Sequence, residues 1–285
     1  MTVVLENVKK KYKSFELDLN MTIETGTITG LIGKNGAGKS TTFKAILGLI
    51  KLNEGRVLID GKDTKALSIS EKEDIGVVLS ESGFSVYMTV KDVMEVMAAM
   101  YHKFDKKDFE EKCKHFGIPL NQKIKEFSTG MKAKLKVLIA ISHGAKLLIL
   151  DEPTAGLDVV ARDEILNMLR EYMEEEGNSI LISSHISSDL EGLCDDVYFI
   201  ENGKIILHED TDTLIDEYGV IKVTQEQYKK LDKEYLLCTK EDKYGCTCLT
   251  KHKHYFMENY PDIVVEKSSI DEVITLMLGG RKEGK

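Results

Sequence analysis

The chain has 285 residues, of which 42% are hydrophobic and 31% charged, and its formal net charge is −9 at pH 7. This composition excludes a disordered chain, because enough apolar side chains are present to form a core, and the acidic balance argues against a nucleic-acid-coating protein. No apolar run approaches the ~18 residues that cross a bilayer, and "MTVVLENVKK" places its apolar stretch before its lysines, unlike a signal peptide. We therefore expect a cytoplasmic chain whose five cysteines are reduced.

Strand and helix patterns alternate through residues 1–216. In chain order they predict three strands within 1–32, a helix over 39–49, a strand and turn at 55–63, a buried strand at 74–80, helices between about 89 and 143, and then further strands and helices up to a hairpin around "ENG". Such alternation predicts an α/β fold with a mostly parallel sheet covered on both faces.

The segments beyond Glu217 are shorter. Their predicted order is β-α-β-β-α-β-α, which is compatible with a small ferredoxin-like unit, so we expect a separate α+β domain over 217–285. The end of the chain after Thr275 is expected to fray.

A glycine-rich motif follows the third predicted strand and precedes the first helix. "GKNGAGKST" matches G-x-x-x-x-G-K-[ST] in full, a pattern in which backbone N–H groups face phosphate oxygens, Lys39 contacts the β- and γ-phosphates and Ser40 ligates Mg²⁺. A chance glycine turn is the alternative. The candidate nucleotide-binding residues are Gly33, Lys34, Asn35, Gly36, Ala37, Gly38, Lys39, Ser40 and Thr41.

Two further buried strands end in groups that suit phosphate chemistry. "KLLILDEPT" places Asp151 where it can hold Mg²⁺ through water and Glu152 where it can polarise an attacking water. "SILISSH" delivers His185 to the same edge of the sheet. The alternatives are an ordinary strand end with a solvated turn for the carboxylates and a helix cap for His185.

Together these motifs resemble the ATP-binding subunit of an ATP-binding-cassette (ABC) transporter over residues 1–216. The resemblance rests on the phosphate loop, "LLILDEPTAGLD", "SSH" and "FSTGM", all in the family's order. It implies a P-loop NTPase cassette with a RecA-like mixed sheet, an antiparallel β part and a helical subdomain at about 82–143. It also implies an ATPase that uses ATP and Mg²⁺ and dimerises with a second copy of itself or a homologous subunit.

The resemblance assigns further roles. Tyr12 falls where the family stacks an aromatic ring on adenine, with a plain strand-end tyrosine as the alternative. Ser128, Thr129 and Gly130 fall in the signature that contacts ATP held by the other subunit, and Asp158 falls where the family couples the two ATP sites. Glu152 falls at the catalytic base and His185 at the switch position.

The sequence departs from the family at two motifs. Ser80, with Glu81 beside it, occupies the position of a glutamine that contacts Mg²⁺ and the attacking water, so we expect hydrolysis to persist with altered coupling. Thr129 and Met131 replace a glycine and a glutamine of the signature. The variant resembles ABC-2-type subunits of exporters with separate membrane proteins, such as those for peptide antibiotics or phenol-soluble modulins.

Two other patterns leave alternatives open. Cys246, Cys248, His252 and His254 could ligate a metal, but their spacing is not that of zinc pairs and small core residues of a hairpin are favoured, so zinc is not expected. The methionines and Tyr101 of helix 89–101 form a stripe that suits the core or a groove for a membrane subunit equally.

The leading hypothesis is therefore an ATPase motor on the inner face of the membrane, bound to a transmembrane subunit and to no nucleic acid. A soluble ABC ATPase that acts on ribosomes or nucleic acid is the alternative, and a nucleotide-gated regulatory module is a third. Cargo, transport direction and the role of residues 217–285 are not encoded in any motif.

Overall fold

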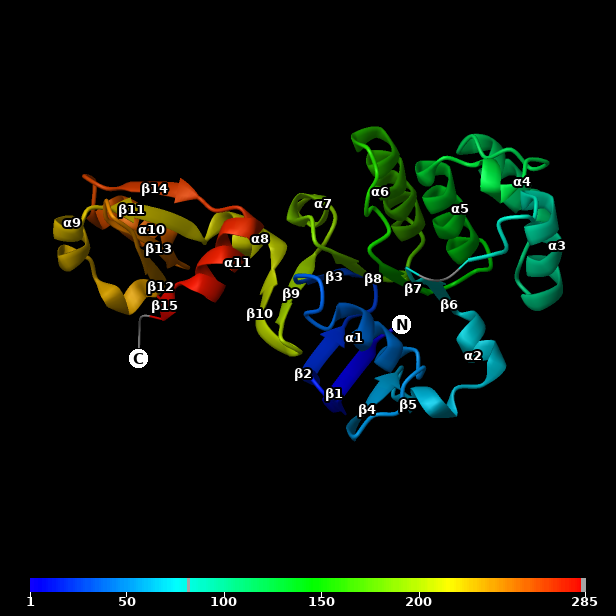
Figure 1. Ribbon diagram of the computed structural model, residues 1–285, viewed down its shortest axis with the longest axis horizontal. Helices are drawn as coiled ribbons and strands as arrows, with labels where there is room; N and C mark the ends of the chain where they lie inside the picture. The colour runs from blue at the N-terminus through cyan, green and yellow to red at the C-terminus, as the bar shows by residue number, and fades with distance from the viewer. Residues whose placement is uncertain (81–82, 283–285) are drawn as a thin grey trace. The chain divides into compact units, whose positions relative to one another are not determined.

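The chain forms two compact units, Met1–Leu207 and His208–Lys285 (Figure 1). The computed structural model describes residues 1–80 and 83–282. Strand β10 (Lys204–Asp210) crosses the division between the units. The sequence predicts a boundary after residue 216, which is the end of helix α8 (Thr211–Asp216). The two divisions differ in the unit to which the end of β10 and α8 are assigned.

The first sheet of the first unit has four antiparallel strands from the start of the chain. Its order is β2-β1-β4-β5, with β1 at Val3–Lys11, β2 at Glu16–Ile23, β4 at Glu54–Ile59 and β5 at Lys62–Asp63. Every second residue of β2, from Leu17 to Ile23, is buried. This period of two leaves one face of the sheet for the core and the other for solvent.

The second sheet of this unit is mostly parallel. Its order is β10-β9-β3-β8-β7-β6, with β3 at Ile28–Ile32, β6 at Ile75–Val78, β7 at Leu147–Asp151, β8 at Ser179–Ser184 and β9 at Asp196–Glu201. All residues of β7 and β8 are buried, as expected for parallel strands covered on both faces. The carboxyl ends of β3, β6, β7 and β8 share one edge.

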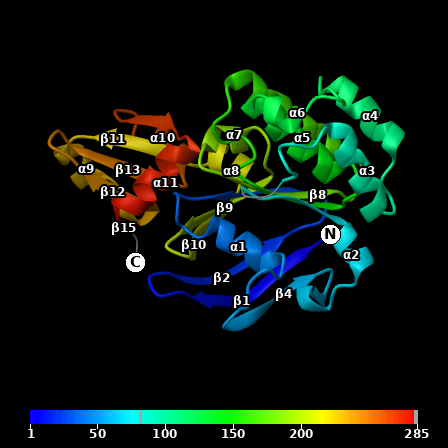
Figure 2. The ribbon, with the colours of Figure 1, turned by 45° about the vertical axis from the view of Figure 1, so that its right-hand side comes forward.

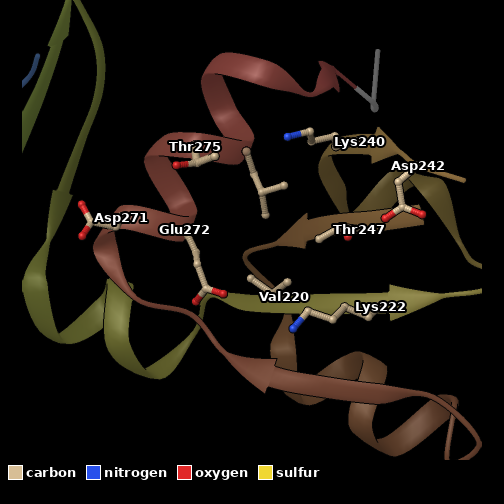
Figure 3. Close-up of a pocket in the computed structure, with 9 residues that line it drawn as sticks. Val220, Lys222, Lys240, Asp242, Thr247, Asp271, Glu272 and Thr275 are labelled. Carbon is tan, nitrogen blue, oxygen red and sulfur yellow. The ribbon is translucent and has the colours of Figure 1, made fainter. Parts of the chain in front are cut away.

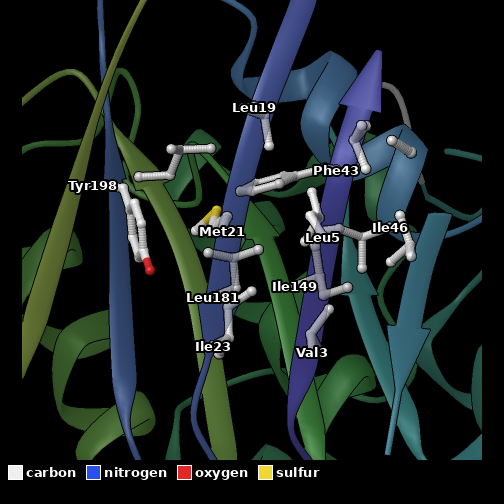
Figure 4. Close-up of a cluster of buried hydrophobic side chains, with 14 of the residues drawn as sticks. Val3, Leu5, Leu19, Met21, Ile23, Phe43, Ile46, Ile149, Leu181 and Tyr198 are labelled. Carbon is white, nitrogen blue, oxygen red and sulfur yellow. The ribbon is translucent and has the colours of Figure 1, made fainter. Parts of the chain in front are cut away.

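Helix α1 (Lys39–Ile46) is packed between the two sheets (Figure 2). Phe43 and Ile46 are fully buried in a cluster with Leu5, Met21 and Ile149, which come from both sheets (Figure 4). Truncating a buried phenylalanine of this kind costs about 3–5 kcal/mol. The packing fixes α1, and with it the loop that precedes α1.

Further helices follow on the side of the parallel sheet opposite α1. They are α3 (Val90–Met100), α4 (Lys106–His115), α5 (Thr129–Ile141), α6 (Val159–Met173) and the short α7 (Ser187–Glu191), and a short α2 (Ile69–Glu73) precedes β6. Among them, α5 packs on β6 and α7 on β8. Met94 and Met97 of α3 are buried, whereas Met100 is 62% exposed, so the methionine stripe is divided between core and surface.

The second unit is built on an antiparallel sheet of order β14-β11-β13-β12-β15. Its elements are β11 (Gly219–Val223), α9 (Gln225–Lys230), β12 (Leu236–Glu241), β13 (Cys246–Thr250), α10 (Lys253–Asn259), β14 (Val264–Lys267), α11 (Ile270–Gly279) and β15 (Arg281–Lys282). One face of the sheet packs on Tyr228 of α9 and Phe256 of α10. Between the other face and α11 lies a hollow of about 380 Å³ whose lining is largely charged (Figure 3).

Two details of the second unit bear on the sequence-based expectations. Cys246 and Cys248 are buried in the cluster below the sheet, while His254 is exposed, so these side chains do not share a surface. The expected fraying is wrong for Arg281–Lys282, because β15 pairs with Thr239 and Cys238 of β12. Backbone pairing with an edge strand holds this segment despite its polar sequence.

Candidate nucleotide-hydrolysis site

The loop between β3 and α1 requires glycine for steric and conformational reasons. Gly36 and Gly38 have φ values of 83° and 122°, which side chains with a Cβ rarely adopt. A Cβ on Gly33 would lie 2.4 Å from the carbonyl oxygen of Ile200. The loop therefore curls tightly at the start of α1, where backbone N–H groups suit an anion.

Lys39 is buried above this loop, with 6% of its surface exposed. Its ammonium donates a hydrogen bond to the carbonyl oxygen of Gly33 at 2.5 Å and lies 3.1 Å from Oε1 of Glu152. The second contact is an ion pair without hydrogen-bond alignment, because Oε1 is a buried oxygen with no hydrogen-bond partner among the described residues. The positive charge is thus held at the mouth of the loop.

Asp151 forms a network of oxygen atoms at the end of β7. Its Oδ2 accepts from the hydroxyl of Ser40 at 2.7 Å and its Oδ1 accepts from the hydroxyl of Ser183 at 2.8 Å. Ser183 in turn accepts from the N–H of Glu152 at 3.0 Å. The hydroxyl of Ser40 and the carboxylate of Asp151 are the hard oxygen donors that Mg²⁺ prefers, so these residues fit a magnesium ion.

Ser183 is a residue that the sequence analysis missed. It lies opposite Asp151 in the register of the parallel β7–β8 pair. Its signal in the sequence was its position two residues before His185 in a buried strand, where a polar residue needs a hydrogen-bond partner.

Glu152 lies between two cationic or protonatable groups. Its Oε2 is 2.5 Å from Nδ1 of His185 and also accepts from the backbone N–H of His185 at 3.2 Å. Because an ionised carboxylate only accepts, Nδ1 of His185 donates, and within residues 1–80 and 83–282 no hydrogen-bond partner occupies Nε2. Glu152 has a φ of 54°, a strained value for a residue with a side chain, and such values cluster at functional sites.

Except for Gly33, Ser183 and His185, these groups line one cavity of about 460 Å³. It is lined by Phe15, Lys34, Asn35, Gly36, Gly38, Lys39, Ser40, Thr41, Ser80, Asp151 and Glu152. Residues from four segments far apart in the sequence thus face the same space. Apart from Phe15, the sequence analysis had singled out every residue of this lining.

Comparison with known proteins decides the family. The family model described as "ABC transporter" matches residues 17–155. The lantibiotic transport ATP-binding protein SrtF of Streptococcus pyogenes is 35% identical over 211 residues, which cover 73% of this chain and 90% of SrtF. The chain belongs to the ABC transporter ATP-binding family. It is an ABC ATPase cassette that binds and hydrolyses ATP for transport, and the resemblance stated from its motifs is confirmed.

Solved structures confirm the cassette fold. An ATP-binding subunit of an ABC transporter matches with a TM-score of 0.67 and 25% identity, covering 75% of this chain and 92% of the other. A bacterial ABC transporter cassette described as dimeric matches with a TM-score of 0.66 and 22% identity, covering 73% and 98%. Within the described residues, no helix of the cassette is long and apolar enough to cross a bilayer.

The residues of the signature do not line the nucleotide cavity of their own chain. Ser128 caps α5 by accepting from the N–H of Met131 at 3.1 Å. A Cβ on Gly130 would lie 2.8 Å from Cβ of Ala161, so the start of α5 packs closely on the first turn of α6. Asp158 caps α6 through the N–H of Ala161. None of these residues lines the cavity around Lys39.

The positions that differ from the family pattern also have defined places. Ser80 is exposed and lines the nucleotide cavity. Glu81 lies outside the described residues. Ser80 also borders a second cavity of about 350 Å³, together with Thr129, Asp151 and Glu152. Thr129 and Ser80 therefore border the same space, next to the carboxylates of Asp151 and Glu152.

Tyr12 does not line the nucleotide cavity, and the nearby aromatic residue that does is Phe15. Tyr12 is 47% exposed, its ring centroid is 6.2 Å from that of Phe15, and the ammonium of Lys10 lies 5.2 Å above it. The role of Tyr12 against adenine stays a prediction. Phe15 was missed because its turn, "KKKYKSF", carries no motif beyond its aromatic residues.

Proposed function

We propose that this cassette is the motor subunit of an exporter whose membrane-spanning subunit is a separate chain. The observation that carries the proposal is the position of Glu152, whose carboxylate is held at the edge of the phosphate-loop cavity between Lys39 and His185. The name of SrtF, a lantibiotic transport protein, supports export of peptide-like cargo.

In the proposed mechanism, the loop from Gly33 to Thr41 binds the phosphates and Lys39 contacts the β- and γ-phosphates. Ser40 and Asp151 would hold Mg²⁺, which would neutralise charge on the phosphates. Glu152 accepts a proton from the attacking water, since its carboxylate is aligned by His185 and faces the cavity. His185 keeps its Nε2 for the γ-phosphate.

The sites are completed by a second cassette, either another copy of this chain or a homologous subunit. Ser128, Thr129 and Gly130 bind the γ-phosphate of ATP held by the other cassette, with the start of α5 as the anion-binding end. Asp158 couples the two sites. Val159 and Val160, beside Asp158, are exposed apolar residues that a second cassette would cover. The solved dimeric cassette supports this arrangement.

The remaining roles are proposals as well. Tyr12 stacks on adenine, and Ser80 with Glu81 senses the membrane subunit, which holds the cassette on the inner face of the membrane. Residues 217–285 form an accessory domain of ferredoxin-like type, supported by its β-α-β-β-α-β order. No zinc site is proposed, since no group of three or more His, Cys, Asp or Glu side chains in the described part of the chain is arranged for a metal.

Purification from membranes tests the proposal. We expect the cassette to co-purify with a multi-span membrane protein, and the Glu152→Gln variant to retain ATP and form a dimer. A Glu152→Gln variant that stays monomeric at physiological ATP, with or without that membrane protein, contradicts the two-cassette arrangement. Co-purification with ribosomal RNA in place of a membrane protein contradicts the motor role and supports a ribosome-associated ATPase.

A further inference from the structure

A buried polar cluster lies behind the Glu152–His185 pair and has no place in the mechanism described so far. It consists of Thr154, Asp189 and Arg162. Thr154 is 1% exposed and Asp189 is 4% exposed. A buried carboxylate such as that of Asp189 is uncommon unless it is paired, and its partners here come from the loop after β7 and from α6.

The cluster joins the two segments that carry the catalytic pair. The hydroxyl of Thr154 donates to Oδ2 of Asp189 at 2.8 Å. Thr154 is two residues after Glu152, and Asp189 is four residues after His185, on α7. The two segments are thus bonded twice, once at the cavity through Glu152 and His185 and once in the interior through Thr154 and Asp189.

Arg162 connects a third element to the same carboxylate. Its Nη1 lies 3.4 Å from Oδ1 of Asp189, and it belongs to α6, whose first residue follows Asp158. The Nε of Arg162 is buried and has no hydrogen-bond partner in the described part of the chain. The ion pair is therefore looser than a bidentate one, and Thr154 is the better-aligned partner of Asp189.

The strained backbone of Glu152 has to be held in place by hydrogen bonds on both sides of the residue. A residue with a side chain at a φ of 54° persists only when its surroundings determine its conformation. On the strand side the N–H of Glu152 is fixed by Ser183. On the other side, the chain after Glu152 is fixed where Thr154 bonds to Asp189.

We propose that Asp189 is a positioning residue for ATP hydrolysis. It aligns the Glu152 carboxylate with His185 through Thr154, and it ties α6, which begins beside Asp158, to the same point through Arg162. This inference rests on the proposed roles of Glu152 and His185. Asp189 itself does not line the nucleotide cavity, so it acts on the rate through the groups that do.

Steady-state ATPase kinetics of the full-length protein test the inference. Thr154→Val removes the hydroxyl at constant shape, and Asp189→Ala removes the carboxylate. We expect each to lower kcat about 10- to 100-fold, the effect of a misplacement of about 1 Å, with the KM for ATP unchanged because the phosphate loop is untouched. Thr154→Ser, which keeps the hydroxyl, is expected to retain most of the rate.

A double-mutant cycle separates positioning from a general loss of stability. If Thr154 and Asp189 act through His185, Thr154→Val adds little to the loss already caused by His185→Ala, whereas independent effects multiply. Single-turnover measurements with excess enzyme make these low rates accessible. Asp163→Asn, an exposed carboxylate on α6 next to Arg162, is the matched control and should leave kcat unchanged.

Wild-type kcat in Thr154→Val overturns the inference, and so does an undiminished Thr154→Val effect in the His185→Ala background. Thr154→Val leaves the Asp189–Arg162 pair in place, so it carries the test even where Asp189→Ala fails to fold. Wild-type kcat in both Glu152→Gln and His185→Ala would instead contradict the proposed catalytic roles. Loss of rate in those two variants with wild-type kcat in Thr154→Val contradicts the positioning role alone.

Discussion

The two edges of the parallel sheet use polar residues in opposite ways. At the carboxyl edge, the Glu152 carboxylate contacts Lys39 and His185, and Asp151 accepts a hydrogen bond from Ser40. All of these residues except His185 line one cavity. At the amino edge, polar side chains bind the backbone or pair on the surface: Tyr172 donates to the carbonyl oxygen of Ala145 at 3.0 Å, and Lys146 pairs with the exposed Glu175. Residues at the amino edge therefore stabilise the fold, whereas residues at the carboxyl edge form the candidate site.

This difference distinguishes a ligand-binding site from a region whose polar groups serve the fold. At the amino edge, partners such as the carbonyl oxygen of Ala145 belong to the fold itself. At the carboxyl edge, charges are held by other charges around a strained residue and a glycine loop. Such an arrangement can bind phosphate and magnesium. We therefore expect substitutions at the carboxyl edge to change kcat and substitutions at the amino edge to change the free energy of unfolding.

The largest effect is expected at the carboxyl edge from Glu152→Gln. Loss of the general base should lower kcat about 10²- to 10⁴-fold, while binding of ATP persists because the phosphate loop is intact. Rapid-quench ATPase assays and nucleotide retention measure both quantities. Glu171→Gln, an exposed residue of α6, is the control. A kcat of Glu152→Gln within two-fold of wild type would contradict a catalytic role for the carboxyl edge.

A smaller effect is expected from Ser80→Gln, also at the carboxyl edge. The longer amide side chain reaches further into the cavity than serine and adds one hydrogen bond near Glu152. One such bond corresponds to about a two- to ten-fold change in the ratio of partner-stimulated to basal turnover. Turnover with and without the membrane subunit checks this, and identical rates in both conditions contradict it.

At the amino edge, Tyr172→Phe should change stability alone. It removes one partly buried hydrogen bond to Ala145, so the free energy of unfolding should fall by about 1 kcal/mol. Urea denaturation measures this loss, and kcat should equal that of wild type. A fall in kcat at unchanged stability would show that the amino edge takes part in catalysis.

The last expected effect depends on pH and concerns His143, which is buried and lies tilted against Tyr101 with ring centroids 4.2 Å apart. Burial lowers the pKa of His143. Between the lowered pKa and about pH 6.5, the unfolded chain therefore binds a proton at His143 that the folded chain does not bind. The free energy of unfolding falls as the pH drops through this range.

The contribution of one proton cannot exceed about 1.4 kcal/mol per pH unit. His143→Gln should flatten the stability profile between pH 7 and 5, as measured by thermal unfolding. His254→Gln, an exposed histidine of the second unit, should leave the profile as it is. An unchanged profile in His143→Gln would assign the pH dependence to other groups.

The sequence by itself determined the phosphate loop, the carboxylates after β7, His185 after β8 and the alternation of strands and helices. These follow from local rules, because glycine spacing, apolar runs and polar strand ends are each visible within about ten residues. Short elements with weak periodicity, such as α2 and β15, were not predictable, since two to five residues carry too little pattern.

Only the tertiary structure decided how the site residues contact one another and which further residues join them. Ser183 bonds to Asp151 because the parallel register places them opposite each other, and Phe15 lines the cavity because its hairpin turns toward the loop. Thr154, Asp189 and Arg162 meet because three helix and strand ends converge behind Glu152. Such contacts depend on side-chain direction and on the packing of distant elements, which no local pattern of residues specifies.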